Sequence, residues 1–172
     1  MKRLVKVAKD IPWHPQPGEG RLYITDELPD PTICSTAFGF VFENDKILLT
    51  RLRDRDWDIP GGCIDAGEAS QDAAVREVWE ETSARVEIVE LVGIQELEVF
   101  GPKPDGYRWP YPISVQVMYL CRLVELRPFE ENHESSERGF FDPDAARMIP
   151  TMVNHDAIYE EALRRAMQSR AD

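Results

Sequence analysis

The alternation of apolar and polar residues along the chain predicts several β-strands. Runs of β-branched and aromatic residues that are bounded by Gly, Pro, Asn or Asp are typical of strands. Such runs occur at 37–42, 47–51, 86–100, 113–124 and 139–141. Residues 43–46 form the predicted turn between the first two strands, and Gly93 is expected to break the third.

Two segments have the apolar spacing of helices. The first spans 69–82, with Ser70 as the expected N-cap. The second spans 154–169, and its apolar side carries Ile158, Ala162, Leu163 and Ala166. Residues 142–144, Asp-Pro-Asp, are expected to open a further helical turn. Strands mixed with helices, without a regular alternation, predict an α+β fold in which helices pack on a mixed sheet.

The N-terminal segment differs from the rest of the chain in its proline content. Residues 1–31 contain Pro12, Pro15, Pro17, Pro29 and Pro31. We therefore expect an irregular arm at 1–31, with a short strand at 20–25. The chain of 172 residues is long enough for one domain with a buried core, and we place that domain at 32–168.

The charge of the chain limits its partners. The formal net charge is −12 at pH 7, so a long polyanion such as DNA would be repelled, and we expect no nucleic-acid partner. A small phosphorylated substrate requires a local positive charge, which a divalent cation would supply. No apolar run approaches the roughly 20 residues that span a bilayer, and residues 1–10 lack a signal-peptide core. We therefore expect a cytoplasmic protein without a membrane partner.

The cysteines and histidines carry little functional signal. Cys34, Cys63 and Cys121 are odd in number, widely spaced and without a Cys-x-x-Cys pair, which favours free thiols. Three scattered histidines are expected to be structural or on the surface: His14, His133 and His155.

A cluster of like charges carries the strongest chemical signal. Glu77, Glu80 and Glu81 stand at i, i+3 and i+4, which places them on one face of the predicted helix. Carboxylates so close together repel one another, and a bound cation is the simplest compensation. Mg²⁺ prefers such oxygen ligands, often together with substrate phosphates. A solvated acidic helix face is the ordinary alternative, so the cluster alone is weak support for a metal site.

The residues around the cluster strengthen the metal hypothesis. Gly61 and Gly62 precede the helix and allow the backbone to approach a ligand closely. Arg76 adjoins the first carboxylate and is expected to pair with Glu68 or to orient Glu77.

The spacing of these residues resembles the signature of the Nudix hydrolases. Gly62, Glu68, the run Arg76-Glu77-Val78 and the pair Glu80-Glu81 occur at the offsets of that pattern. The lead-in Trp57-Asp58-Ile59-Pro60-Gly61 is also similar. Ser83 departs from the pattern, because the family has a glycine there that ends the helix in a left-handed conformation. A serine in that conformation costs on the order of 1 kcal/mol.

The resemblance implies a fold and a reaction. The fold would be a Nudix-type α/β/α sandwich with a central mixed sheet and flanking helices. The reaction would be hydrolysis of a nucleoside diphosphate linked to another group X, by water activated on Mg²⁺, with Mn²⁺ as the alternative ion. Glu77, Glu80 and Glu81 would be the metal ligands, and one of them could take a proton from water. Glu68 and Arg76 would support the helix and the glycine loop.

Other site residues are expected with less support from the pattern. The family often uses a further acid from a distant loop; Glu137 is our first choice and Glu134 the second. Candidates for substrate contacts are Arg51, Arg53, Arg55, Trp57, Tyr107, Trp109 and Tyr111, of which we select Arg51, Trp57, Tyr107 and Trp109. A homodimer formed through residues 1–31 is expected only by analogy.

Two alternatives remain at this level. A Nudix-fold regulator or isomerase would lack the hydrolase activity, although a regulator would normally have lost carboxylates and gained a DNA-binding segment. A purely structural or protein-binding domain would leave the glutamate cluster unexplained. The sequence does not choose among ADP-ribose, other nucleotide sugars, oxidised nucleotides and dinucleotides as substrates.

Overall fold

The computed structural model describes residues 1–169. Its strands are β1 (Arg3–Lys9), β2 (Gly18–Ile24), β3 (Cys34–Glu43), β4 (Lys46–Leu52), β5 (Asp56–Asp58), β6 (Gly61–Cys63), β7 (Ala84–Val99), β8 (Ile113–Leu126) and β9 (Ser135–Phe141). Its helices are α1 (Ser70–Thr82), α2 (Pro143–Ala146), α3 (Pro150–Asn154) and α4 (Asp156–Gln168), preceded by a 3-10 turn at Pro31–Ile33.

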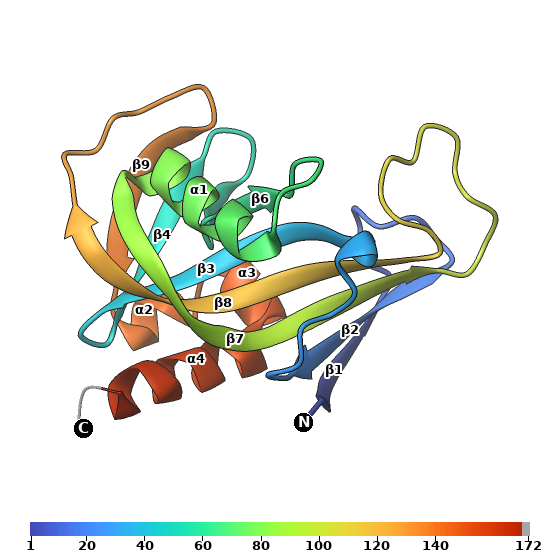
Figure 1. Ribbon diagram of the computed structural model, residues 1–172, viewed down its shortest axis with the longest axis horizontal. Helices are drawn as coiled ribbons and strands as arrows, with labels where there is room; N and C mark the ends of the chain where they lie inside the picture. The colour runs from blue at the N-terminus through green and yellow to red at the C-terminus, as the bar shows by residue number, and fades with distance from the viewer. Residues whose placement is uncertain (170–172) are drawn as a thin grey trace.

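The strands form one mixed sheet with helices on both faces (Figure 1). The strand order is β1-β2-β7-β8-β3-β4-β5, with β6 paired to β3 and β9 paired to β4. β3 and β8 are parallel, and the other pairs are antiparallel. α1 lies against one face of the sheet and α4 against the other. The predicted α+β sandwich with a mixed central sheet is confirmed.

Each face of the sheet has its own apolar core. Successive side chains of a strand point to opposite faces, so Phe40 and Phe42 of β3 pack in the same cluster as Tyr159 of α4. Val41, between them, packs in the cluster that contains Val78 of α1. The sheet is therefore a rigid platform that holds α1 from one side and leaves part of its other face, beyond α4, open for a cavity.

The N-terminal segment is more ordered than its prolines suggested. The short strand expected near 20–25 is confirmed by β2, but the expectation that most of residues 1–31 is irregular was wrong for β1. β2 pairs with β7 along its whole length, so this segment extends the central sheet. The division into an arm at 1–31 and a domain at 32–168 stays an interpretation, as does the homodimer.

Gly93 does not break its strand, contrary to our expectation. β7 runs from Ala84 to Val99 without interruption. A side chain at Gly93 would place its Cβ 2.4 Å from the carbonyl oxygen of Tyr23 and 2.7 Å from Cδ1 of Ile158. Glycine is therefore required here because β2 and α4 approach the strand closely, and not because the chain turns.

The helix ends agree in part with the sequence. Asp142 caps α2, since its carboxylate accepts a hydrogen bond from Ala145 N at 3.0 Å. Ser70 is not the N-cap of α1; Ala69 occupies that position, and the Ser70 hydroxyl instead contacts Tyr119 Oη at 2.7 Å. The C-terminal helix is confirmed as α4, whereas α3 was not predicted.

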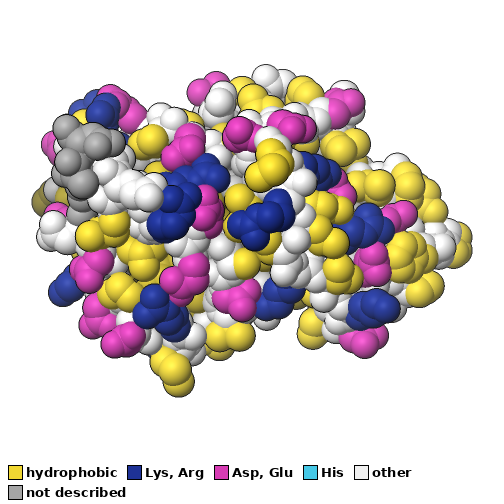
Figure 2. All heavy atoms as spheres, turned by 90° about the horizontal axis from the view of Figure 1, so that it is seen from below, with side chains coloured by type: hydrophobic (Ala, Val, Ile, Leu, Met, Phe, Trp, Pro, Cys, Tyr) yellow, Lys and Arg dark blue, Asp and Glu magenta, His cyan; other side chains and the backbone are white. Residues whose placement is uncertain are grey.

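The structure also bears on what the sequence predicted for the cysteines, for membrane-spanning helices and for the surface charge. The three cysteines are free, as predicted. Within residues 1–169, no helix is both long and apolar enough to cross a membrane. Figure 2 shows acidic and basic side chains interspersed on the face that α4 covers, where Arg147 and Glu160 form an ion pair at 2.7 Å. The cytoplasmic location and the absence of a nucleic-acid partner stay predictions.

Candidate active site

Helix α1 positions two buried carboxylates against the sheet. Ala73, Ala74 and Val78 anchor the helix in the core. One turn apart on the same helix, Glu77 and Glu81 are only 7% and 4% exposed. Glu80 lies to the side of this face and is exposed. The three glutamates of the motif therefore occupy two different environments.

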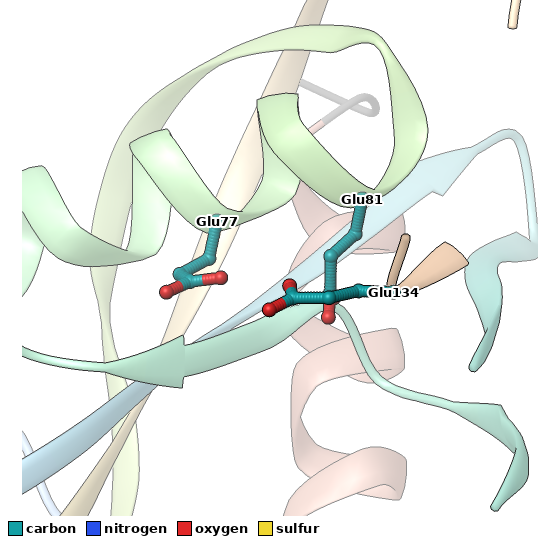
Figure 3. A group of neighbouring side chains, drawn as sticks. All are labelled: Glu77, Glu81 and Glu134. Carbon is teal, nitrogen blue, oxygen red and sulfur yellow. The ribbon is translucent and has the colours of Figure 1, made fainter. Parts of the chain in front are cut away.

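A third carboxylate, Glu134, joins the buried pair from the segment before β9. Oxygen atoms of Glu77, Glu81 and Glu134 lie within 4.8 Å of one another, and Figure 3 shows the three side chains directed toward a common point. Asn132 fixes this segment, since its Oδ1 accepts from Glu134 N at 2.9 Å while its Nδ2 donates to the Glu80 carbonyl at 2.8 Å. The loop that carries Glu134 is therefore tied to α1.

Arg76 holds the glycine loop and the helix together. Its guanidinium donates to both carboxylate oxygens of Glu68, at 2.9 and 3.0 Å, and to the carbonyl oxygen of Cys63 at 2.9 Å. It also donates to Glu77 at 2.8 Å and to Glu80 at 3.2 Å. Arg76 thus makes both of the contacts that we expected, with Glu68 and with Glu77, and its supporting role in the site stays a prediction. It also relieves part of the repulsion within the motif.

The cluster is electrostatically unfavourable without a cation. Burial raises the pKa of Glu81 to about 8, and the nearby Glu77 adds to this shift. Burial also raises the pKa of Glu77, although Arg76 opposes the shift. Hydrogen bonds from Arg76 lower the pKa of Glu68 below its usual range. Burial thus raises the pKa of both buried carboxylates of α1, and a nearby cation would oppose this shift.

The donor set fits a hard divalent cation. Three carboxylates supply oxygen ligands of the kind that Mg²⁺ and Mn²⁺ prefer. Glu81 accepts a hydrogen bond from Gly61 N at 3.0 Å, which fixes its direction. A Cβ atom at Gly62 would lie 2.6 Å from Glu77 Oε1, so only glycine leaves room for the carboxylate there. Glu77, Glu81 and Glu134 could hold such an ion.

A cavity of about 560 Å³ opens beside the cluster, on the other side of β6. Its lining includes Gly61 and Gly62, and these two residues also contact the carboxylates. Charged residues also line it, and four of them are basic (Lys6, Lys9, Arg55 and Arg108) while two are acidic (Asp10 and Asp58). Pockets of this size accept ligands as large as a nucleotide. The cavity therefore provides space and positive charge next to the carboxylates.

The loop between β7 and β8 closes one side of the cavity. Tyr107 and Trp109, both selected from the sequence, line it together with Arg108. The Arg108 guanidinium lies 4.3 Å from the Trp109 ring centroid, and its Nη2 lies 3.7 Å from Cys63 Sγ. The aromatic residues of this loop are therefore within reach of a ligand in the cavity.

Three other predicted site residues lie elsewhere. Arg51 pairs with Glu137 at 2.8 Å on the exposed side of β4 and β9, and neither belongs to the described cavity lining or the carboxylate cluster. Trp57 packs edge-on against Phe141, with ring centroids 4.8 Å apart. Glu134, our second choice for the loop acid, lies with Glu77 and Glu81, where we had expected Glu137. Arg55 lines the cavity in place of Arg51.

The sequence did not lead us to the polar residues on the sheet side of the cavity, which we call its floor. Gln95, Ser114 and Gln116 line the cavity from β7 and β8. Ser114 and Gln116 are separated by one residue in the strand that we predicted at 113–124, and this alternation was the available signal. Gln95 offers no comparable pattern, because its strand alternates acidic and apolar residues.

Ser83 ends α1 in the conformation that the family's glycine would adopt. Its φ and ψ are 55° and 27°, in the left-handed region, and its N–H donates to the Trp79 carbonyl at 2.8 Å. The substitution leaves the helix end in place, and the carboxylates precede it.

Comparisons with known proteins show which proteins this chain resembles. The family model of the NUDIX domain matches residues 34–164. A MutT-like protein of Streptomyces ambofaciens is 38% identical over 80 residues, which are 42% of this chain and 52% of that protein. A putative 8-oxo-dGTP diphosphatase of Bacillus subtilis is 39% identical over 66 residues, 37% of this chain and 44% of that protein. The matched region thus spans about half the length of these relatives.

A solved structure extends the likeness to the whole chain. A pyrophosphohydrolase of Bacillus subtilis superposes with a TM-score of 0.68 over 96% of this chain and 98% of that chain. The two sequences are 21% identical, so this similarity concerns the fold. At 96% of this chain, it extends beyond residues 34–164, the region that the family model matches.

Proposed function

The chain belongs to the NUDIX domain family, and we propose from this premise that it hydrolyses the pyrophosphate bond of a nucleoside diphosphate linked to another group. The observation that carries the proposal is the group of three carboxylates from Glu77, Glu81 and Glu134, whose oxygens lie within 4.8 Å of one another. They lie beside a cavity that is lined by more basic than acidic residues. A motif match alone would not require the third carboxylate, which comes from a different part of the chain.

The carboxylates have distinct roles in this proposal. A bound divalent ion, Mg²⁺ or alternatively Mn²⁺, supplies neutralisation of phosphate charge and a lower pKa for water. Glu77, Glu81 and Glu134 would hold it. Arg76 keeps the Glu77 carboxylate directed at the cluster, and the Gly61 N–H does the same for Glu81. One of these three carboxylates would instead accept the proton from the attacking water. Glu80, which we also expected among the metal ligands, is exposed, and its part in binding the ion stays a prediction.

The cavity would receive the substrate with its phosphates toward β6. Arg55 and Arg108 lie on the wall and can neutralise phosphate oxygens. Gly61 and Gly62 have no side chains that would obstruct a phosphate between the cavity and the carboxylates. The remainder of the substrate would then lie against the sheet floor and the aromatic residues of the loop between β7 and β8.

A substrate panel tests the proposal. Purified protein is incubated with nucleotide sugars, dinucleotides, coenzymes and nucleoside triphosphates, including 8-oxo-dGTP, in Mg²⁺, in Mn²⁺ and in a chelator. We expect turnover of at least one compound that requires the added ion and disappears in the chelator. Equal product formation by the Glu81→Gln protein would point to a contaminating enzyme. The absence of ion-dependent turnover on every compound would refute the hydrolase proposal.

A further inference from the structure

The floor of the cavity is a block of polar side chains on a sheet face that is otherwise apolar. In the strand register, Gln95 of β7 lies opposite Gln116 of β8, and Leu97 lies opposite Ser114. Thr36 of β3 is the partner of Gln116 on the other side. Cross-strand partners point to the same face and lie side by side. The register therefore places these hydroxyl and amide groups together across three adjacent strands.

One polar atom of this block is buried and unpaired. The Thr36 hydroxyl oxygen is withdrawn from solvent and makes no hydrogen bond within residues 1–169, and Thr36 lines the cavity. Ser114 is 2% exposed and Gln95 is 8% exposed. Ser114, which is buried, and Gln116, which is half-buried, also line the cavity. Buried polar groups are almost always paired, because each unpaired group costs free energy. This arrangement is typical of a site that is completed by a polar ligand.

His155 holds the side chain of Gln95 from the opposite wall. The His155 Nε2 atom lies 3.2 Å from Gln95 Oε1, and its Nδ1 atom lies 2.9 Å from the Thr151 carbonyl oxygen. The Thr151 hydroxyl in turn donates to Asp58 at 2.8 Å. Asp58 precedes the glycine pair, so this chain of contacts joins the cavity floor to the segment beside the carboxylates.

Given the proposed hydrolase function, we propose that Gln95, Gln116 and Ser114 recognise the nucleobase of the substrate, and that His155 positions Gln95 for this contact. Carboxamide and hydroxyl groups both donate and accept, which matches the edges of a nucleobase. Tyr107 and Trp109 line the same cavity and offer faces for stacking. The enzyme then selects a nucleoside phosphate by its base, and the group beyond the diphosphate contributes less.

Kinetics of variants test the base contact. The nucleotide turned over fastest in the panel is compared with its base-free ribose phosphate counterpart. In Gln95→Leu and Gln116→Leu, kcat/KM for the nucleotide should fall about 10- to 100-fold, mainly through KM, while the base-free compound is unaffected. Gln71→Leu makes the same chemical change at an exposed position of α1 and should change neither value. An equal loss on both compounds, or no loss, would overturn the proposal.

The proposed positioning of Gln95 by His155 requires a separate measurement. His155→Ala should reduce the ratio of kcat/KM values between the preferred base and the other bases. Because it acts through Gln95, adding Gln95→Leu should cause little further loss of that ratio. If His155 had only a structural role, His155→Ala would lower the stability of the protein and leave the ratio unchanged. Thermal unfolding measures the stability of each variant. Additive losses of the ratio would contradict the positioning role.

A binding measurement separates this proposal from the hydrolase proposal. Calorimetry with the Glu81→Gln protein and the four common nucleoside monophosphates needs no turnover. Base-dependent affinity that Gln95→Leu removes would support the recognition site even if no compound were hydrolysed. Turnover without any base preference in either assay would refute the recognition site alone.

Discussion

The carboxylate cluster and the floor of the cavity lie on either side of β6, and they are built in different ways. Two members of the cluster, Glu77 and Glu81, come from successive turns of one helix, so the sequence spacing already places them together. Gln95, Gln116 and Thr36 meet only because three strands pair in one particular register. The chemistry is therefore encoded locally, whereas the proposed specificity depends on long-range pairing.

The two regions also differ in charge. The cluster concentrates negative charge in a buried place, which raises the pKa of Glu81 to about 8. The floor groups Gln95, Gln116 and Ser114 are uncharged. Changes in pH and in divalent cations should therefore act on the cluster, and changes in the base should act on the floor.

The largest effect is expected when a carboxylate of the cluster is neutralised. Glu81→Gln should lower kcat by more than about 100-fold, because even outer partners of metal ligands are typically worth 10- to 100-fold. The protein should remain folded, since glutamine has the size of glutamate and its side-chain oxygen can still accept from Gly61 N. Steady-state kinetics measure kcat, and circular dichroism shows whether the variant is folded. Glu80→Gln, at an exposed position of the same helix, is the matched control and should have a smaller effect.

A second comparison concerns the two loop acids. Glu134→Gln should reduce kcat about 10- to 100-fold, because Glu134 lies with the buried carboxylates. Glu137→Gln should change kcat by less than about threefold, because Glu137 forms an exposed pair with Arg51. The kcat values of the two variants, measured under identical conditions, decide which loop acid belongs to the site. The reverse order would restore our original choice of Glu137.

The pH dependence of stability isolates the charge of the cluster. The unfolded Glu81 carboxyl loses its proton near pH 4.5 and the folded one near pH 8. Between these values the metal-free folded protein binds more protons, so this group makes the free energy of unfolding fall as pH rises. Urea denaturation in a chelator should show this decline, and Mg²⁺ or Mn²⁺ should reduce it. The same decline in Glu81→Gln would assign it to other groups.

The smallest predicted effect concerns the end of α1. Ser83→Gly should raise the free energy of unfolding by up to about 1 kcal/mol, because a left-handed φ of 55° favours glycine. The carboxylates precede this residue, so kcat should stay within about twofold of the unchanged protein. Thermal denaturation and kinetics of the same preparation are sufficient. A large loss of turnover would show that the position of the helix end controls the cluster.

The predictability of the site follows from how its parts are assembled. Glu68, Arg76 and Glu77 lie within one loop and helix, and their contacts followed from spacing. Glu134 joins them through Asn132, whose bond to the Glu80 carbonyl depends on tertiary structure. No local pattern distinguishes Glu134 from Glu137 until the start of β9 at Ser135 is known.

The fold was predictable to a similar extent. The strands around Phe40 and Leu48 have clear apolar patterns, and both are buried in the core. β1 was missed because it is an edge strand with mostly exposed residues, so its sequence carries little periodicity. Gly93 was misinterpreted as a break because close approach and chain reversal both require glycine.

The most direct test of the central claim is to follow an isotope from the solvent. The preferred nucleotide is hydrolysed in water enriched in ¹⁸O, with Mg²⁺, by the unchanged protein and by Glu81→Gln, and the products are analysed by mass spectrometry. The account predicts one labelled oxygen on one phosphate product per turnover, formed at a rate that Glu81→Gln reduces by at least about 100-fold. Unlabelled products, or equal rates of labelling by both proteins, would contradict it.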